Sequence, residues 1–269
     1  MRRIILVILL FLLCLSCSRR AAGIIIAGST SVQPFAEVLA EEYALAHPES
    51  AIDIQGGGSA AGIMAARSGT ADIGMSSRSL NDDERRLWSC EIAKDGLAII
   101  VHPNNPVQDL TIKQVSDIYS GKITEWGELG GRKARIHIIA REEGSGTRSA
   151  FESLVMVKDQ ISPKAIVQDS NGAVKQLVSG DVNSIGFISL GLVDHTVKAL
   201  SLNHIAPNRE NVINGSYSLF RPFLFVAEND PAGGAGEFVD FTLSEEGQQI
   251  LVHEGLIHGV GVMKRGMEP

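Results

Sequence analysis

Three short segments combine glycine with serine or threonine at places where a helix is expected to begin. They are residues 28–31 (Gly-Ser-Thr-Ser), 56–59 (Gly-Gly-Gly-Ser) and 144–147 (Gly-Ser-Gly-Thr). The first turn of a helix has backbone N–H groups without intrahelical partners and the positive end of the helix dipole, so it favours an anion. Glycine lets the backbone approach a ligand closely, and hydroxyl groups add uncharged donors. Together, the three turns could surround a tetrahedral oxyanion.

One of these turns also has a cation beside it. Arg141 lies at the end of the strand predicted before the third turn, and its planar guanidinium can bind two oxygens of one anion. Each turn taken singly is equally typical of an ordinary helix cap or a connecting loop. The coincidence of three turns, one of them with an arginine, favours a binding site. From the residues alone, the prediction is an anion-binding α/β protein.

Each turn lies between a strand-like run and a helical pattern. The runs are residues 23–27, 51–55 and 136–140, and apolar residues at helical spacing follow each turn. Strands that alternate with helices predict α/β units around a largely parallel sheet. Further strands are predicted at residues 72–76, 97–101, 185–188 and 219–226, and further helices at residues 112–119, 173–178 and 237–252.

Two segments break the alternation of strands and helices and are interpreted as crossings between lobes. One is residues 102–106 (His-Pro-Asn-Asn-Pro), and the other is the stretch from residue 215 to residue 222. If both are hinges, residues 23–102 and 220–269 form lobe I and residues 103–219 form lobe II.

The N-terminal residues have the pattern of an export signal. Arg2 and Arg3 precede an apolar run, residues 4–15, which is too short to span a bilayer and has the length of a signal-peptide core. The chain is therefore predicted to be exported, with residues 1–16 as the signal peptide.

Cys17 lies where this signal peptide would be cut. With small Ser16 before it, Cys17 resembles the acylated cysteine of the bacterial lipobox, which implies lipidation of Cys17 and a tether of residues 17–22. Cys14 departs from the pattern, because the lipobox usually has leucine there. Simple secretion and a retained leader are the alternatives.

The composition excludes several classes of protein. A chain of 269 residues that is 44% apolar, with a net charge of −7, is globular and too acidic to bind nucleic acid by neutralising phosphates. Its three cysteines cannot form a disulfide scaffold. Removing the leader takes away two of the 24 basic residues and none of the 31 acidic ones, leaving a net charge of about −9. Anion recognition must then be local, because salt screens long-range attraction.

Six runs of residues along the chain, three of which contain the turns described above, together resemble one known family. They are residues 27–34, 55–59, 71–78, 141–147, 170–172 and 184–187. In this order they resemble the phosphate-binding proteins of bacterial ABC transporters, the PstS family, and Arg-x-x-Gly-Ser-Gly-Thr at residues 141–147 is the most specific of them. The resemblance implies a two-lobed periplasmic-binding-protein fold of type II. In that α/β fold, mostly parallel sheets are flanked by helices and the ligand lies in the cleft between the lobes.

The same resemblance implies a function, partners and a location. A monomer without cofactor or enzymatic activity would bind inorganic phosphate and deliver it to the permease of an ABC transporter. It would be held by its lipid anchor at a bacterial membrane, facing the periplasm or the cell exterior. The phosphate-binding residues that the resemblance implies are Thr30, Ser31, Ser59, Ser77, Arg141, Ser145, Gly146 and Thr147. Glu143 matches the acidic residue that pairs with the arginine and orients it.

Ser77 departs from the pattern of some members of the family, which have an aspartate at this position. A buried carboxylate accepts the proton of a protonated phosphate and disfavours fully ionised sulfate. The Ser77 hydroxyl can donate or accept. Selectivity between phosphate, sulfate and arsenate is therefore open.

Two alternatives to a phosphate-binding protein are also open. One is a binding protein for another tetrahedral oxyanion, and the other is an exported phosphoester hydrolase that uses the same anion cradle. A hydrolase needs an activated nucleophile or a metal, and no histidine is near the three turns in sequence. His253 and His258 are five residues apart, off the helical spacing that binds zinc, so no metal site is predicted.

Overall fold

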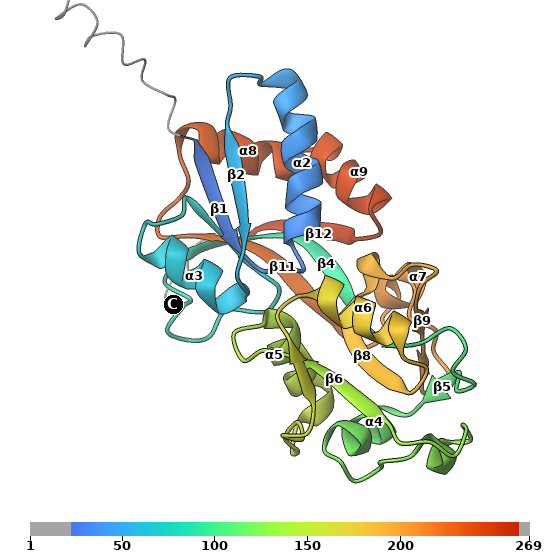
Figure 1. Ribbon diagram of the computed structural model, residues 1–269. Coiled ribbons are helices and arrows are strands. Elements are labelled where there is room, and N and C mark those ends of the chain that lie inside the picture. The colour runs from blue at the N-terminus through green and yellow to red at the C-terminus, as the bar shows by residue number, and fades with distance from the viewer. Residues whose placement is uncertain (1–22, 264–269) are drawn as a thin grey trace, which may run out of the picture.

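The computed structural model describes residues 23–263, which fold into two bodies joined by long strands (Figure 1). The predicted signal peptide and tether, with Cys17, lie outside the described residues. Within the described range, the model contains no helix of the length and apolarity that crossing a membrane requires.

Twelve strands and eight α-helices make up the described chain. The strands are β1 (Ile24–Gly28), β2 (Ile52–Gly56), β3 (Ile73–Ser76), β4 (Trp88–Val101), β5 (Asp109–Leu110), β6 (His137–Arg141), β7 (Ile166–Gln168), β8 (Ser184–Ser189), β9 (Lys198–Ala199), β10 (Ser201–Leu202), β11 (Phe220–Ala227) and β12 (Ile257–Met263). The helices are α2 (Gln33–Ala46), α3 (Ser59–Arg67), α4 (Ile112–Tyr119), α5 (Gly146–Phe151), α6 (Asn171–Gly180), α7 (Arg209–Ile213), α8 (Gly233–Leu243) and α9 (Glu245–His253).

The main sheet has the strand order β2-β1-β3-β11-β4-β8-β6-β7. β1 runs parallel to β2 and β3, and β6 runs parallel to β7 and β8. Between these groups, β11 is antiparallel to β3 and β4, and β4 is antiparallel to β8. The predicted α/β class is confirmed. The sheet is mixed rather than mostly parallel, because β4 and β11 carry the chain in opposite directions between the two bodies.

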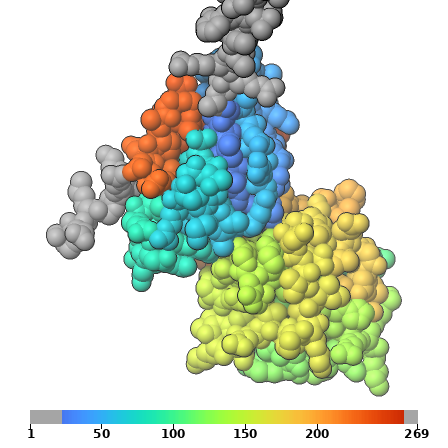
Figure 2. Space-filling view, turned by 60° about the vertical axis from the view of Figure 1, so that its left-hand side comes forward, coloured from blue at the N-terminus to red at the C-terminus, as the bar shows by residue number. Residues whose placement is uncertain are grey.

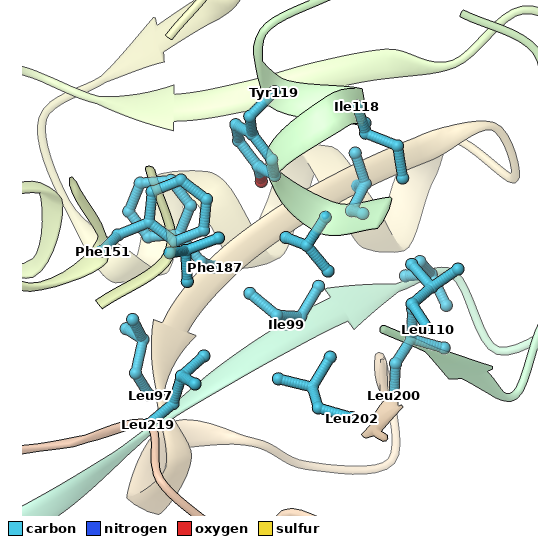
Figure 3. Packing of buried hydrophobic residues seen from close by; sticks show 14 of the residues in the cluster. Leu97, Ile99, Leu110, Ile118, Tyr119, Phe151, Phe187, Leu200, Leu202 and Leu219 are labelled. Atoms are coloured by element: carbon cyan, nitrogen blue, oxygen red, sulfur yellow. The ribbon is translucent and has the colours of Figure 1, made fainter. Parts of the chain in front are cut away.

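Two large apolar clusters form the cores of the two bodies, and β4 contributes to both. Cys90 and Ile92, in the first half of β4, pack with α2, α8 and α9. Leu97 and Ile99, in the second half, pack with α4 and with Phe187 of β8 (Figure 3). A single strand therefore runs from one core into the other.

Figure 2 shows the two bodies as separate masses, one of blue, cyan and orange residues and one of green and yellow residues. The predicted lobe boundaries at residues 102/103 and 219/220 remain a proposal. Because residues 97–101 pack in the second core, the packing favours a first boundary inside β4.

Two predicted elements differ in extent from those observed. The strand predicted at residues 97–101 is the second half of the longer β4, and the helix predicted at residues 237–252 is the pair α8 and α9. Ser244 separates these two helices, because its extended backbone ends α8 and its hydroxyl accepts a hydrogen bond from Gly247 N to cap α9. A Cβ atom built on Gly247 would lie 2.2 Å from the Phe241 carbonyl oxygen, so this corner has room only for glycine.

Candidate anion-binding site

Four loops that lead from a parallel strand into a helix meet between the two bodies. β1 leads into α2 and β2 into α3 in the first body, and β6 leads into α5 and β7 into α6 in the second (Figure 1). Ligands of open α/β sheets bind beyond the carboxyl ends of the strands, where helix N-termini present N–H groups. The sequence predicted three of these turns, and α6 adds a fourth. We call the residues gathered here the cage: Ser29, Thr30, Ser31, Ser59, Ser77, Arg141, Glu142, Ser145, Gly146, Thr147 and Asn171.

Hydrogen bonds join the two sides of the cage. The Ser31 and Thr147 hydroxyl oxygens lie 2.7 Å apart, although 116 residues separate them in the chain. Arg141 Nη2 donates to Thr30 Oγ1 at 3.1 Å, across the same boundary. Backbone atoms meet as well, since Ala60 N donates to the Gly144 carbonyl at 3.2 Å. The predicted turns from both lobes are therefore in direct contact.

Three serines from three loops of the first body form a buried hydroxyl cluster. Ser29 Oγ donates to Ser77 Oγ at 2.9 Å, and Ser77 Oγ lies 3.3 Å from Ser59 Oγ. Ser77 N also donates to Ser59 Oγ at 3.0 Å. All three side chains are almost fully buried. The structure thus brings Ser77, the position at which the chain departs from the family pattern, together with Ser59.

At Gly146 the second body leaves no room for a side chain against the first. A Cβ atom built on Gly146 would lie 2.2 Å from Ser59 Oγ and 2.6 Å from Ser77 Oγ. On the opposite side, Gly58 has a φ of +86° and caps α3, a conformation that side chains rarely adopt. Glycine at these two positions therefore lets the α3 and α5 N-termini face each other.

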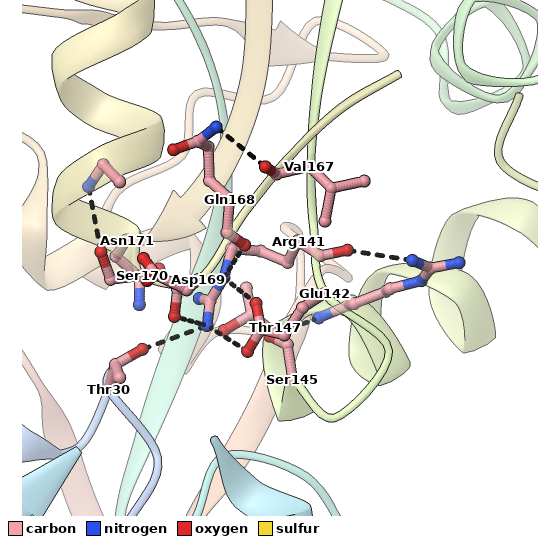
Figure 4. Close-up of polar contacts among 12 residues, drawn as sticks. Thr30, Arg141, Glu142, Ser145, Thr147, Val167, Gln168, Asp169, Ser170 and Asn171 are labelled. Atoms are coloured by element: carbon pink, nitrogen blue, oxygen red, sulfur yellow. Dashed lines mark hydrogen bonds and ion pairs between the residues drawn. The ribbon is translucent and has the colours of Figure 1, made fainter. Parts of the chain in front are cut away.

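Arg141 is the buried cation of the cage, with a side chain only 1% exposed. Its Nε and Nη2 donate to the Glu142 carboxylate at 2.8 and 2.9 Å (Figure 4). Nη2 also donates to the Asp169 carbonyl at 3.0 Å. Nη1 is buried and has no hydrogen-bond partner in the described part of the chain. An unpaired charged donor of this kind is costly to bury, so the residues present fit an anion that accepts from Nη1.

The acidic partner of Arg141 is Glu142 and not the predicted Glu143. Glu143 is exposed, whereas both carboxylate oxygens of Glu142 accept from Arg141. The reason is the direction of the turn: Ser145 N bonds back to the Glu142 carbonyl, and this tight turn leaves Glu143 on its outer side.

Asn171, at the start of α6, is a cage residue that sequence reasoning missed. Its Oδ1 accepts from Ser189 N at 3.2 Å, and its Nδ2 donates to Ser31 Oγ at 2.7 Å. The signal in the sequence was Ser170-Asn171-Gly172, where Ser170 caps the helix. This run was read only as part of the family resemblance.

A buried ion pair lies behind the cage, where β4 and β11 cross between the bodies. Arg221 of β11 donates from Nε and Nη2 to Asp95 Oδ2 of β4 at 3.1 and 3.0 Å, and the two side chains are 2% and 1% exposed. Ser189 Oγ donates to Asp95 Oδ1 at 2.7 Å. Burial raises the pKa of Asp95, while Arg221 and Ser189 oppose that rise. The pair therefore joins β4, β8 and β11, and Ser189 connects it to Asn171 of the cage through its own N–H.

Arg78, which follows Ser77, does not add charge to the cage. Its guanidinium donates to both carboxylate oxygens of Glu84, at 2.7 and 2.8 Å. This hydrogen bond holds the pKa of Glu84 below its ordinary value.

The cage offers hydroxyl, guanidinium and backbone N–H donors, and this chemistry suits the binding of an anion. No cage residue is a histidine or a cysteine, so the hydroxyl groups have no adjacent imidazole base. Among residues 23–263, no group of three or more histidine, cysteine, aspartate or glutamate side chains could hold a metal ion.

A protein-family model and several curated sequences match this chain. The model describes a PBP superfamily domain and matches residues 18–246. Phosphate-binding protein PstS of Bacillus subtilis is 30% identical over 240 residues, covering 87% of this chain and 79% of that protein. The protein of the same name from Pseudomonas aeruginosa is 31% identical over 262 residues, covering 86% of this chain and 81% of that protein.

Solved structures also match over nearly their whole length. A phosphate ABC transporter substrate-binding protein from Clostridium perfringens, crystallised with bound phosphate, is 45% identical with a TM-score of 0.85. The match covers 88% of this chain and 99% of that one. An ABC-type phosphate transport receptor from Vibrio cholerae is 42% identical with a TM-score of 0.73, covering 87% of this chain and 99% of that one.

Proposed function

Because the chain belongs to the PBP superfamily, and within it to the PstS-type phosphate-binding proteins, we propose that it binds inorganic phosphate between its two lobes. It then delivers the phosphate to the permease of an ABC transporter. The observation that carries the proposal is Arg141 Nη1, a buried guanidinium nitrogen without a partner in a cage of hydroxyl groups and helix N-termini. Phosphate supplies the oxygen atoms that this nitrogen lacks.

The predicted phosphate-binding residues and Glu142 have the following roles in this proposal. Arg141 gives a charge-assisted hydrogen bond from Nη1, and Glu142 fixes the plane of the guanidinium. The hydroxyl groups donate from both lobes, and the first turns of α3 and α5 add backbone N–H groups. The proposed phosphate-binding residues are Thr30, Ser31, Ser59, Ser77, Arg141, Ser145, Gly146 and Thr147.

Binding in this proposal is coupled to closure of the lobes. The contacts between Thr30 and Arg141 and between Ser31 and Thr147 join residues of the two bodies, so they form only when the bodies meet. An anion that contacts both sides stabilises the closed arrangement over an open one. No bond of the phosphate is made or broken, and the protein acts as a carrier.

The location of the protein is part of the proposal. Residues 1–16 direct export, Cys17 is acylated, and the binding lobes face the periplasm or the cell exterior as a membrane-anchored monomer. Mass spectrometry of the membrane fraction tests this directly. We expect a mature N-terminal peptide that begins with lipid-modified Cys17, and an unmodified peptide beginning elsewhere would refute the anchor.

Titration calorimetry with phosphate tests the binding function. Replacing Arg141 by alanine should weaken binding by about 1.5–3 kcal/mol, the scale of a hydrogen bond to a charged group. Lys113→Ala is the matched control, because it removes the same charge from a side chain that is 81% exposed and pairs with Asp117, away from the cage. Near wild-type affinity in the arginine variant would remove Arg141 from the site.

An assay with an activated phosphate ester separates the carrier from the hydrolase alternative. A carrier leaves the ester intact at any protein concentration. Turnover that survives purification away from contaminating phosphatases would refute the carrier and favour the hydrolase.

A further inference from the structure

A cavity of about 430 Å³ lies in the second body, at the end of β6 opposite to the cage (Figure 1). We call it the outer cavity; residues from three segments line it, 120–124, 135–138 and 162–166. The register of the sheet leaves room for it, because β7 pairs with β6 only from Ile139 onward. Before β7, the chain bends toward α4 instead, where Ser162 N donates to the Tyr119 carbonyl at 2.7 Å. The volume is within the range of ligand pockets, about 300–1,000 Å³.

Apolar and hydroxyl side chains share the walls of the outer cavity. The apolar lining residues are Ile123, Ile136, Ile138, Pro163 and Ile166, and the hydroxyl residues are Ser120, Thr124 and Ser162. Ile166 is 48% exposed, although it is a large apolar residue in a strand. A ligand that covers this side chain removes apolar surface from water, which favours binding. The walls therefore suit a molecule with an apolar part.

The charged residues that line the outer cavity are all cations. Arg135 and Lys164 line it, and neither aspartate nor glutamate does, in a chain whose net charge is −7. Within residues 23–263, the side chains of these two cations belong to no ion pair or hydrogen bond. The nearby carboxylates of Glu125 and Glu128 are engaged, because they cap the 3₁₀ turn that begins at Trp126. Two uncompensated cations at one cavity favour an anion.

His137 adds a third nitrogen-bearing side chain, and its orientation is fixed. Its Nδ1 lies 2.6 Å from Asp181 Oδ2, and Asp181 is held in turn by Ser184 Oγ at 2.7 Å and by Asn183 N at 2.9 Å. An ionised carboxylate only accepts, so Nδ1 carries the proton of this bond. Nε2 has no hydrogen-bond partner in the described part of the chain. When the imidazole is protonated, Nε2 is a further donor for an anion.

We propose that the outer cavity is a second ligand site, which binds a small organic anion with an apolar body, such as an aromatic carboxylate or sulfonate. The acid group of the ligand contacts Arg135 and Lys164, and its apolar body covers Ile138 and Ile166. Inorganic phosphate has no apolar body, so it does not compete at this site. The inference goes beyond the proposed function and is independent of it, because the outer cavity and the cage lie at opposite ends of β6.

The first test uses anilinonaphthalene sulfonate, a fluorescent aromatic sulfonate, as the probe. The purified protein is titrated with it in the absence of phosphate and with phosphate in excess, and nuclear magnetic resonance spectra map the residues that respond. We expect saturable binding that phosphate does not displace, with shifts concentrated in residues 120–124, 135–138 and 162–166. Phenylnaphthylamine has the same rings without the sulfonate, and it should bind about tenfold more weakly, since it lacks the charge that Arg135 and Lys164 attract.

A pair of double variants tests the two cations. Arg135→Glu with Lys164→Glu should weaken binding of the sulfonate by about tenfold or more, because like charges then face each other. Arg132→Glu with Lys133→Glu is the matched control, since it makes the same change of charge at exposed residues that do not line the cavity. It should keep nearly wild-type affinity. Circular dichroism shows whether each variant folds, and the spectra of the wild-type protein locate the site without them.

Three results would overturn the inference. They are the absence of saturable binding to the wild-type protein, displacement of the sulfonate by phosphate with shifts at the cage, and an equal loss of affinity in the two double variants. Failure of phosphate itself to bind would refute the proposed function and leave the test of the outer cavity unaffected.

Discussion

Gly146→Ala offers a sharp test of how the two lobes meet. The added Cβ would lie 2.2 Å from Ser59 Oγ, 2.6 Å from Ser77 Oγ and 2.9 Å from Ser59 Cβ. The two hydroxyl groups can rotate away, but Ser59 Cβ is held by α3, so we expect α5 to move away from the first lobe. The substitution therefore acts on closure of the lobes and on the ligand that closure encloses.

The expected loss can be worked out from the hydrogen bonds that cross this boundary. The bonds from Arg141 to Thr30, from Ala60 to Gly144 and between Ser31 and Thr147 would lengthen or break. Each contributes about 0.5–1.5 kcal/mol, so the three together give a loss of about 1.5–4.5 kcal/mol in phosphate binding. That corresponds to an affinity lower by about 10-fold to 2,000-fold.

The stability of the ligand-free protein should not fall with the affinity. Replacing glycine by alanine where the backbone permits it stabilises a fold by about 0.4–1 kcal/mol, and Gly146, the first residue of α5, does not have a positive φ. Calorimetry with phosphate and thermal unfolding with and without phosphate measure the two effects separately. We expect unchanged or slightly raised stability without phosphate, and little stabilisation by phosphate.

Gly172→Ala is the matched control for this experiment. Gly172 lies in the first turn of α6 in the same lobe, and a Cβ there would have no heavy atom within 4 Å. It should keep wild-type affinity. Wild-type affinity in Gly146→Ala as well would refute the reasoning, because the two lobes would then close without the contact seen at Gly146.

Three further predictions concern the buried charges and the buried thiol. Glu84→Gln should cost about 1–2 kcal/mol of unfolding free energy near neutral pH. Arg78 lowers the pKa of Glu84, so this stabilisation is present above the unfolded-state pKa and is lost as the pH falls through the folded-state pKa; urea unfolding of both proteins in acid should show no difference. Burial raises the pKa of Cys90 to about 12, so iodoacetamide should label it only after unfolding, in a chain whose other two cysteines are serine; rapid native labelling would contradict this. Asp95→Ala should cost about 3–5 kcal/mol by leaving Arg221 buried and unpaired, and the double variant with Arg221→Met should recover part of the loss in urea unfolding.

The features that could be predicted from the sequence are those that depend on a few neighbouring residues. The turns at residues 28–31, 56–59 and 144–147 lie just before helices as expected, because glycine and hydroxyl residues after an apolar run favour the end of a strand and a tight loop. Of the three, the third turn has a hydroxyl cap, Ser145, whereas Val32 and Gly58 occupy the N-cap positions of α2 and α3. Arg141 was found for the same reason, since its place at a strand end is visible locally.

The parts that the sequence did not predict depend on contacts between distant residues. Glu142 and Glu143 are chemically identical neighbours, and only the direction of the folded turn decides which one reaches Arg141. Asp95 and Arg221 are 126 residues apart and become partners through the register of β4 and β11. Asn171 looks like an ordinary first residue of a helix until Ser31 is brought against it. No local pattern carries such information.

The near-complete burial of the cage serines limits how fast a bound ion can exchange. Ser29, Ser31, Ser59 and Ser77 are almost inaccessible to solvent, so we expect an ion bound among them to leave only when the two bodies separate. The residence time of the ligand is then the waiting time for the lobes to part. A receiving transporter that lowers the barrier to this opening would unload the carrier quickly at any given affinity, and strong retention in solution would be compatible with rapid turnover at the membrane.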